Sequence, residues 1–552
     1  MRGLSMIEMS SPMEVKEAAF QYIDDNREWL SEFHLEIWDY AEPAFREYRS
    51  SSAYVRLLRG EGFEVEEGTG GMPTAFMATW GEGRPLLGTY AEYDAVPGHN
   101  QKPVPYRAPR EGLHPYAAGH TDPHSALGVA ALFGVLAAKY VMERFGLRGS
   151  LRLFGEPAEK VCGSKPVHAA KGYYDGADAY ISYHPGYANY VRGEIQGGTY
   201  WSVLFQFECD DPVEWYGLTA VDATPYRRGW HSGGRVPAAL DAVCLMYTLT
   251  KMSKEAMLPH TAYWTLNEFI MVGGQCTSDN LPPKISQVQY AYRSPTLSMQ
   301  ERITRVLENN ARAAAEAAFS EVYERWITKT RVGLPNLVMA EVAYENLKLV
   351  GPPRYGEEAK EFAREVQRNL GCEPMSEPFL EYGLTYGGGE AEKPILSPGE
   401  MDGLLRRAHP AWVRNMGSDD YVDYTWHAPT VRFFTSRPVL RPLPDGRPYP
   451  WWVHVAMGGN PSTIDPCIIT AAKTIAATLI DLLLKPEILR KAWSEFDERT
   501  DGGVGGSKWV APLLPRDFEP PIELRWPEYI STPRGEEWWI PTLQNLKEYR
   551  RL

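Results

Sequence analysis

Apolar residues in the first part of the chain follow a helical spacing and then give way to short runs typical of strands. Over residues 13–49 they recur at steps of three and four, as in a helix with one buried face. Residues 126–141 are apolar almost all round, which predicts a buried helix with Asp122 as its N-cap and Pro123 as its first residue. Strand-like runs lie on both sides of this helix, at 76–81, 84–91, 151–155 and 179–183. Such an alternation predicts a mostly parallel α/β sheet.

The pattern changes near residue 195. A strand, a helix, two strands and a helix are expected next, at 200–210, 237–252, 263–274, 284–295 and 298–319. This order is typical of the ferredoxin-like split unit, so we predict an inserted α+β domain. We therefore predict an α/β domain in two parts, residues 1–195 and 333–500, with an inserted domain at 196–332. An irregular extension rich in Trp and Pro follows at 501–552.

Composition and charge narrow the classes of protein that fit. The 552 residues are 44% hydrophobic and 23% charged, as in a globular chain long enough for two or more domains. A net charge of −14 argues against a nucleic-acid partner and against an anionic membrane surface. No apolar run is expected to reach the ~20 residues of a membrane span, and the N-terminus lacks an apolar secretory core. Six cysteines without a C-x-x-C pair favour a reducing cytoplasm.

Side chains with acid–base or metal-binding chemistry follow the ends of the predicted strands or begin the buried helix. They are Asp94, His120, Asp122, His124, Glu159, Lys160 and His184. Open α/β sheets gather their chemistry in the crevice beyond the carboxyl ends of their strands. These residue types at that edge predict a metal-dependent hydrolase.

Several motifs, in order along the chain, resemble one family. They read HLEIWDYAEPAFREYRSS (34–51), EYDAVPG (92–98), GHTDPHSA (119–126), GEPAEK (155–160), YHPG (183–186), GGRVPAALDAV (233–243), YRSPTLSMQERI (292–303) and GSDDYVDYTWHAPT (417–430). Over roughly residues 15–500 the chain resembles the metal-dependent aminoacylase and carboxypeptidase-type amidohydrolases, in particular the aminobenzoyl-glutamate hydrolase branch. The resemblance implies a catalytic α/β domain and an inserted lid domain that forms a homodimer.

Some of the metal ligands that this resemblance implies are changed here. The family has a cysteine two residues before its first ligand histidine, and if His120 is that histidine, Ala118 takes the place of the cysteine. Two adjacent glutamates, a general base and a metal ligand, correspond to Glu159 and Lys160. The last family histidine falls at about Asp465. We therefore expect that the chain keeps one metal site and has lost the other.

The retained site would use His120 and His184 with a third ligand, since a catalytic metal normally has three protein ligands and a water. Asp94, Asp122 and His124 are the candidates for that third ligand, and the sequence leaves the choice among them open. Histidine and carboxylate ligands suit zinc or manganese. We expect one divalent metal ion per subunit, or two.

The remaining residues receive roles from chemistry and from the resemblance. Glu159 would take a proton from the activated water and return it to the leaving nitrogen. Lys160 would stabilise the developing oxyanion or hold a substrate carboxylate. In the lid domain, the resemblance implies Asn280 and Arg235 as substrate contacts and His231 as a residue that reaches a neighbouring subunit's site.

Three functions remain open from the sequence. The first is hydrolysis of the amide C–N bond in a small N-acyl or aryl-acyl amino compound, by a cytoplasmic homodimer. The second is an aminohydrolase that removes an amino group from an aromatic or heteroaromatic ring, with release of ammonia. The third is a non-catalytic ligand-binding relative. Glu159 beside His120 and His184 argues against the third, because a binding protein does not need a base next to a metal.

Overall fold

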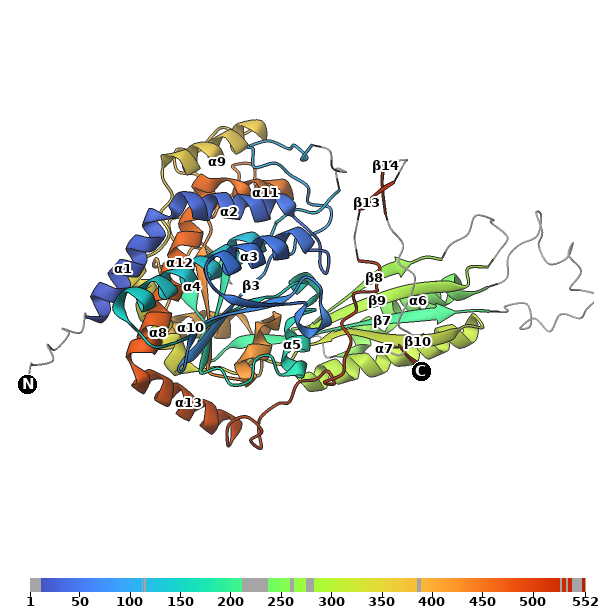
Figure 1. The fold of residues 1–552 in the computed structure, drawn as a ribbon. Helices are drawn as coiled ribbons and strands as arrows, with labels where there is room; N and C mark the ends of the chain where they lie inside the picture. The colour runs from blue at the N-terminus through green and yellow to red at the C-terminus, as the bar shows by residue number, and fades with distance from the viewer. Residues whose placement is uncertain are drawn as a thin grey trace, which may run out of the picture.

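The computed structural model describes residues 11–111, 113, 116–210, 237–258, 263–274, 282–384, 389–526, 529–532, 535–538 and 549–551. Figure 1 shows a larger α/β body, with an elongated sheet and its helices extending from one end. The larger body is the catalytic domain that the resemblance implies, and the elongated one is the lid domain.

The catalytic domain is built on a sheet of seven strands, counted over the described residues, in the order β1-β2-β4-β3-β5-β12-β6. These strands are β1 (Glu64–Glu67), β2 (Phe76–Glu82), β3 (Leu86–Ala91), β4 (Gly149–Gly155), β5 (Ala179–Gly186), β6 (Tyr190–Val191) and β12 (Thr430–Ser436). Strands β4, β3, β5 and β12 run parallel, whereas β2 and β6 pair antiparallel with their inner neighbours. The predicted α/β class with a mostly parallel sheet is confirmed.

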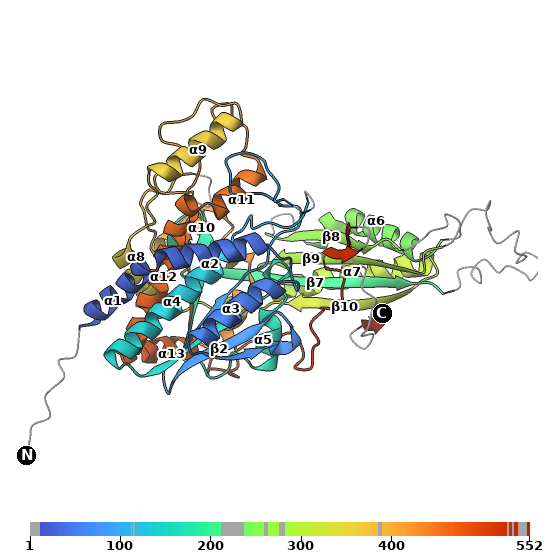
Figure 2. The same cartoon turned by 45° about the horizontal axis from the view of Figure 1, so that its top comes forward.

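Helices surround this sheet. They are α1 (Pro12–Asp25), α2 (Arg27–Tyr40), α3 (Tyr48–Gly60), α4 (His124–Phe145), α5 (Lys165–Lys171), α8 (Leu337–Val350), α9 (Glu357–Asn369), α10 (Pro398–Ala408), α11 (Trp451–Gly459), α12 (Pro461–Leu484) and α13 (Pro486–Thr500). Three short 3₁₀ turns are η1 (Thr69–Gly71), η2 (Glu159–Val161) and η4 (Asp420–Trp426). Figure 2 shows α1, α2, α3 and α4 lying across one side of the domain.

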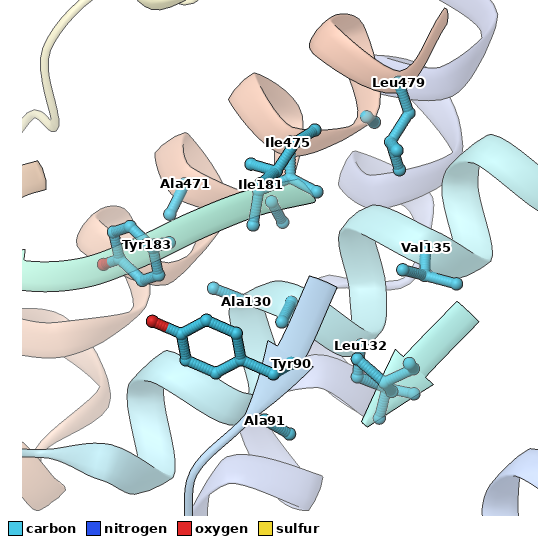
Figure 3. Packing of buried hydrophobic residues seen from close by; sticks show 14 of the residues in the cluster. Tyr90, Ala91, Ala130, Leu132, Val135, Ile181, Tyr183, Ala471, Ile475 and Leu479 are labelled. Carbon is cyan, nitrogen blue, oxygen red and sulfur yellow. The ribbon is translucent and has the colours of Figure 1, made fainter. Parts of the chain in front are cut away.

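The core of the catalytic domain forms where α4 and α12 pack together beside the central strands. Figure 3 shows residues of α4 and α12 meeting the apolar side chains of β3 and β5. The two helices approach closely at Gly134, where a Cβ would lie 2.7 Å from Cγ2 of Ile475. A methyl group there would displace the helix, so the glycine sets the distance between the two helices.

Both core helices, α4 and α12, are long and apolar enough to cross a membrane by length and composition. The expectation that no apolar run reaches that length is therefore wrong. Of their most apolar windows, 89% and 78% are buried inside the protein. A helix that is apolar all round and buried to this extent is typical of the core of a large domain.

The lid domain is a sheet in the order β15-β10-β7-β9-β8, with the short β11 paired to β7. Its strands are β7 (Gln196–Glu208), β8 (Thr265–Val272), β9 (Ile285–Ser294), β10 (Glu321–Lys329), β11 (Asn415–Ser418) and β15 (Tyr549–Arg551). Helices α6 (Ala239–Met257) and α7 (Leu297–Ala317) pack on it. The strand–helix–strand–strand–helix–strand order over β7, α6, β8, β9, α7 and β10 is the one that the apolar pattern indicates.

The C-terminal extension contacts both domains. The Trp509 Nε1 donates to the Trp426 carbonyl of the catalytic domain at 2.6 Å, and the Arg325 Nε of the lid donates to Glu523 Oε1 at 2.8 Å. Strands β13 (Tyr529–Thr532) and β14 (Gly535–Trp538) form a hairpin, and β15 adds an edge to the lid sheet. The expectation of an entirely irregular extension is wrong at these three strands, which are too short to leave a periodic signal.

Candidate metal centre and active site

The carboxyl ends of the parallel strands bring the chemistry together. Glu92 and Asp94 follow β3, Glu159 follows β4 in the η2 turn, and His184 lies near the end of β5. The first residue of α4, His124, meets them there, with its Nε2 3.3 Å from Glu159 Oε2. The predicted crevice at this edge of the sheet therefore contains the acid–base groups that the sequence places there.

His124 is held in the orientation of a metal ligand. Its Nδ1 lies 2.5 Å from Asp94 Oδ1, so Nδ1 carries the proton and donates it to the carboxylate. The Nε2 lone pair then faces the cluster, 3.3 Å from Glu92 Oε2. The ring is fully buried. A carboxylate that fixes the tautomer of a histidine in this way is typical of metal sites.

His184 presents its free nitrogen to the same point. Its Nδ1 donates to the Pro185 carbonyl at 2.8 Å, which leaves Nε2 as the acceptor, 3.5 Å from Asp122 Oδ2. One ligand atom from each of Glu92, His124 and His184 lies within 4.8 Å of the others. Two imidazole nitrogens and adjacent carboxylates are a donor set that fits a divalent transition metal.

Asp94 and Asp122 divide between two roles. Both oxygens of Asp94 are engaged, one by the His124 ring and the other by the Lys160 backbone amide at 2.8 Å. Asp94 therefore orients a ligand from behind. Asp122 is not the helix cap that the sequence predicts, because Pro123 takes the N-cap position and no side chain caps α4. The Asp122 carboxylate is thereby able to face the two imidazoles.

His120 does not join the cluster. It is fully buried, and neither ring nitrogen has a hydrogen-bond partner among the described residues. Burial holds the pKa of His120 well below its ordinary value, so the ring is neutral. Backbone hydrogen bonds in both directions between Val96 and Gly119, each 3.0 Å, fix the chain one residue before it. His120, expected as a metal ligand, therefore lies outside the group of possible ligand atoms, whereas the candidate His124 lies inside it.

This correction changes the assignment of the missing cysteine. Ala118 packs with Ala41 and Ala95 in a small apolar cluster. Counting two residues back from His124 instead of His120 reaches Asp122. If His124 is the first ligand histidine, a carboxylate stands where the resemblance implies a thiolate.

Lys160 lies inside the cluster. Its Nζ is 2.8 Å from His124 Nε2, 3.1 Å from Asp122 Oδ2 and 3.9 Å from Glu159 Oε2. Burial opposes the charge of this ammonium, but the nearby carboxylates of Asp122 and Glu159 prevail and raise the pKa of Lys160. The side chain, 19% exposed, is a tethered and partly exposed positive charge beside the imidazoles.

Glu159 is supported by an unusual backbone turn. Ala158 and Cys162, on either side of η2, both have left-handed backbones, with φ of 58° and 49°. Glu47 Oε1 accepts from the Ala158 amide at 2.7 Å and fixes the turn. Burial and the negative charge of Glu92 raise the pKa of Glu159 well above its ordinary value. A carboxyl group with a raised pKa is a stronger base than an ordinary glutamate.

A second charged group that sequence reasoning missed lies behind the imidazoles. The Lys165 ammonium, fully buried, donates to Glu92 Oε1 at 2.6 Å and to Asp420 Oδ1 at 2.5 Å. Next to it, Arg432 pairs with Asp419. The position of Glu92 directly after a strand, two residues before Asp94, was the available signal for its role.

Other predicted residues lie elsewhere. His231, Arg235 and Asn280 fall outside the described residues. Asp465 lies on α12, accepts a hydrogen bond from Ser31, and has a pKa raised by burial to about 6. Asp465 therefore lies beside α2, and none of the described interactions joins it to the cluster of imidazoles and carboxylates.

Comparisons with known proteins agree with this architecture. No family model matches the chain. The chain is 26% identical over 490 residues to a subunit of the p-aminobenzoyl-glutamate hydrolase of Escherichia coli, and the match covers 87% of this chain and 95% of that protein. It is 27% identical over 369 residues to the Xaa-Arg dipeptidase of Mus musculus, covering 62% and 74%.

A solved structure shows the same fold. The aminobenzoyl-glutamate utilization protein from Klebsiella pneumoniae superposes with a TM-score of 0.50 and 14% sequence identity, over 85% of this chain and 98% of that one. The resemblance that the motifs predict is thus confirmed: over most of its length, the chain is similar to the p-aminobenzoyl-glutamate hydrolase protein of Escherichia coli.

Proposed function

We propose that this protein is a metal-dependent hydrolase that cleaves the amide C–N bond of an N-acyl or aryl-acyl amino compound. Two relatives are named for hydrolysis of such bonds, a p-aminobenzoyl-glutamate hydrolase and a dipeptidase. The observation that carries the proposal is the pair of imidazoles, His124 and His184. Their Nε2 atoms lie 3.3 Å from Glu159 Oε2 and 3.5 Å from Asp122 Oδ2, respectively.

The residues that would hold the metal are His124, His184 and Asp122. They supply three ligands, which leaves positions for water and substrate as a catalytic zinc requires. Zinc or manganese suits this set, and one ion per chain fits a cluster in which Lys160 occupies the neighbouring position. When bound, such an ion polarises the amide carbonyl and lowers the pKa of a water molecule toward neutrality.

Glu159 moves the proton in this proposal. Its carboxylate would accept a proton from the attacking water and return it to the leaving nitrogen. The raised pKa of Glu159 matches it to both steps, because a carboxyl group of ordinary pKa would be a weaker base.

Lys160 supplies positive charge. Its ammonium lies between Asp122 and Glu159, where it can stabilise the oxyanion that develops as the carbonyl is attacked. Because its charge is held by neighbouring carboxylates, it stays protonated through the reaction and acts as an electrostatic group.

We infer further that the protein is a cytoplasmic homodimer that pairs through its lid domain. Strand β8 is the last strand of the lid sheet over the described residues, and its Phe269 and Ile270 are 52% and 51% exposed. Exposed apolar side chains on an edge strand are typical of a surface that pairs with a partner. The five described cysteines are all free, which suits a reducing compartment.

Product analysis tests the hydrolase proposal. The zinc-loaded protein is incubated with a panel of N-acyl and aryl-acyl amino acids, including p-aminobenzoyl-glutamate, and the products are separated by mass spectrometry. We expect a carboxylate and an amine in equal amounts, and at least a ~10²-fold slower reaction for Glu159→Gln, the contribution of a general base. Release of ammonia with an intact amide bond would contradict amide hydrolysis and support the aminohydrolase.

A further inference from the structure

A second set of metal-ligating groups lies next to the imidazole cluster. One carboxylate oxygen each of Glu159 and Asp420 and the Sγ of Cys162 lie within 4.8 Å of one another. Asp420 also forms such a group with Glu92 and Asp419. Neither set contains a histidine, and the set with Cys162 contains the only thiol in the candidate groups of the described residues.

One carboxylate of this set has an oxygen without a partner. Lys165 takes Oε1 of Glu92 and Oδ1 of Asp420, and Glu92 Oε2 lies 3.3 Å from His124 Nε2 on the imidazole side. The other oxygen of Asp420, Oδ2, has no hydrogen-bond partner among the described residues, although this side chain is fully buried. A buried carboxylate oxygen without a hydrogen bond is costly, and a bound cation is one way to satisfy it.

The charge balance of the region also favours a cation. Among the described residues the joined clusters hold six carboxyl groups against three cations in direct contact with them. The carboxyl groups are Glu92, Asp94, Asp122, Glu159, Asp419 and Asp420, and the cations are Lys160, Lys165 and Arg432. One divalent ion at the imidazoles leaves an excess of negative charge, and a second ion would remove it.

Cys162 is fixed in place by both domains. Its left-handed backbone follows η2, and its carbonyl accepts from Thr328 Oγ1 of the lid at 2.6 Å. Its side chain packs with Tyr200 and Ala291, also of the lid. The backbone of Cys162 is therefore fixed and its side chain is packed, which favours the preorganisation that a metal ligand needs.

We propose that Glu159, Cys162 and Asp420 form a second divalent-cation site, selective for a thiophilic ion such as Zn²⁺, and that its occupation inhibits the enzyme. Two carboxylates and a thiolate are three ligands of the types that zinc takes. Binding releases the thiol proton to solvent, because the thiolate is the ligand. The site differs from the imidazole site in residues and in ligand type.

Inhibition follows from the shared ligand, and this half of the inference rests on the proposed function. When Glu159 donates its lone pair to an ion in the second site, it can no longer accept the proton of the attacking water. Zinc at one equivalent would then support activity, and zinc in excess would suppress it.

A cobalt titration of the full-length protein tests the site without reference to activity. The protein is freed of metal with a chelator, and Co²⁺ is added while sulfur-to-cobalt charge-transfer absorption in the near ultraviolet is recorded. We expect no such band during the first equivalent, which fills the imidazole site, and a band that grows during the second. The band should vanish in Cys162→Ser and persist in Cys467→Ser, a matched control at another buried free cysteine.

Activity at stoichiometric and at tenfold excess Zn²⁺ completes the test. We expect the rate at excess zinc, relative to the stoichiometric rate, to fall at least tenfold in the wild type and to stay near one in Cys162→Ser. Absence of the charge-transfer band, or its survival in Cys162→Ser, would overturn the second site and leave the proposed function intact. A band that depends on Cys162 without inhibition would keep the site and remove Glu159 from the role of base.

Discussion

Two lysines five residues apart face the same acidic cluster and have different roles. Lys160 is 19% exposed and contacts the imidazole of His124. Lys165 is fully buried and is held between Glu92 and Asp420. Exposure to solvent decides the difference. A partly exposed cation can meet a substrate, whereas a fully buried cation can only fix the carboxylates around it.

The largest effect should come from removing the buried lysine. We expect Lys165→Met to lower the free energy of unfolding by about 3–5 kcal/mol, because Glu92 and Asp420 would be left as buried carboxylates without their cation. Denaturant unfolding followed by tryptophan fluorescence measures this. The matched control is Lys160→Met, with an expected loss of about 1 kcal/mol or less, as for a partly solvated pair. Equal losses in the two variants would remove the distinction between the lysines.

The exposed lysine should matter for the reaction instead. We expect Lys160→Met to lower kcat/KM about 10²-fold, the usual effect of losing a charge that stabilises an oxyanion. Steady-state kinetics on a substrate from the product analysis measures this. Lys160→Arg should recover part of the rate. A variant with full activity would mean that the ammonium has no part in catalysis.

Reversing the charge at position 160 should change the metal content. We expect Lys160→Glu to raise it from about one ion to about two per chain, because a carboxylate would take the place of an ammonium beside Asp122 and His124. Elemental analysis of protein purified without chelator measures the ratio. Lys160→Met, which removes charge without adding a ligand, should stay near the wild-type value. Metal content that is the same in all three proteins would show that residue 160 does not face a metal position.

The smallest effect concerns pH. The pKa of Glu159 is raised by burial and by Glu92, and the charge of Lys160 opposes that rise. Because the base must be ionised, kcat/KM should fall as pH drops through this raised value, which lies above the ordinary glutamate pKa of about 4.3. In Lys160→Met this fall in kcat/KM should occur at a higher pH. A pH–rate profile of the wild type and of the variant measures the two positions. A fall that occurs at a lower pH in the variant would contradict the assigned electrostatics.

Much of the architecture follows from local patterns. The apolar run at 126–141 produces a buried helix, and the strand-like runs at 84–91, 151–155 and 179–183 become neighbours in one parallel sheet. These elements are predictable because each helix or strand has its own spacing of apolar residues, which can be recognised without knowledge of the rest of the chain. The succession of strands and helices along the lid segment follows for the same reason.

The position of Asp122 and His124, both candidates for the third ligand, depends on where a helix begins. With Asp122 as its cap, α4 would keep that carboxylate at the backbone, but the structure begins the helix at His124 and leaves the Asp122 side chain uncommitted to the cap. A shift of this size lies within the ordinary error of helix boundaries and yet decides which imidazole reaches the metal. The two-residue spacing between Asp122 and His124 was the signal that could have corrected it.

The group around Lys165 could not be found from local sequence. Its two partners lie 73 and 255 residues away along the chain. Only the packing of α5 and η4 against the end of β3 brings Glu92 and Asp420 to one ammonium. A lysine in a short amphiphilic stretch is ordinarily a surface residue, so its burial is a property of the tertiary structure.

The central claim is that His124, and not His120, holds the metal. Metal content per chain in His124→Ala and His120→Ala, both purified without chelator, tests it most directly. We predict that His124→Ala loses its metal and that His120→Ala keeps about one ion, since its ring lies outside the ligand cluster. Loss of metal from His120→Ala with retention in His124→Ala would contradict the assignment and the site built on it.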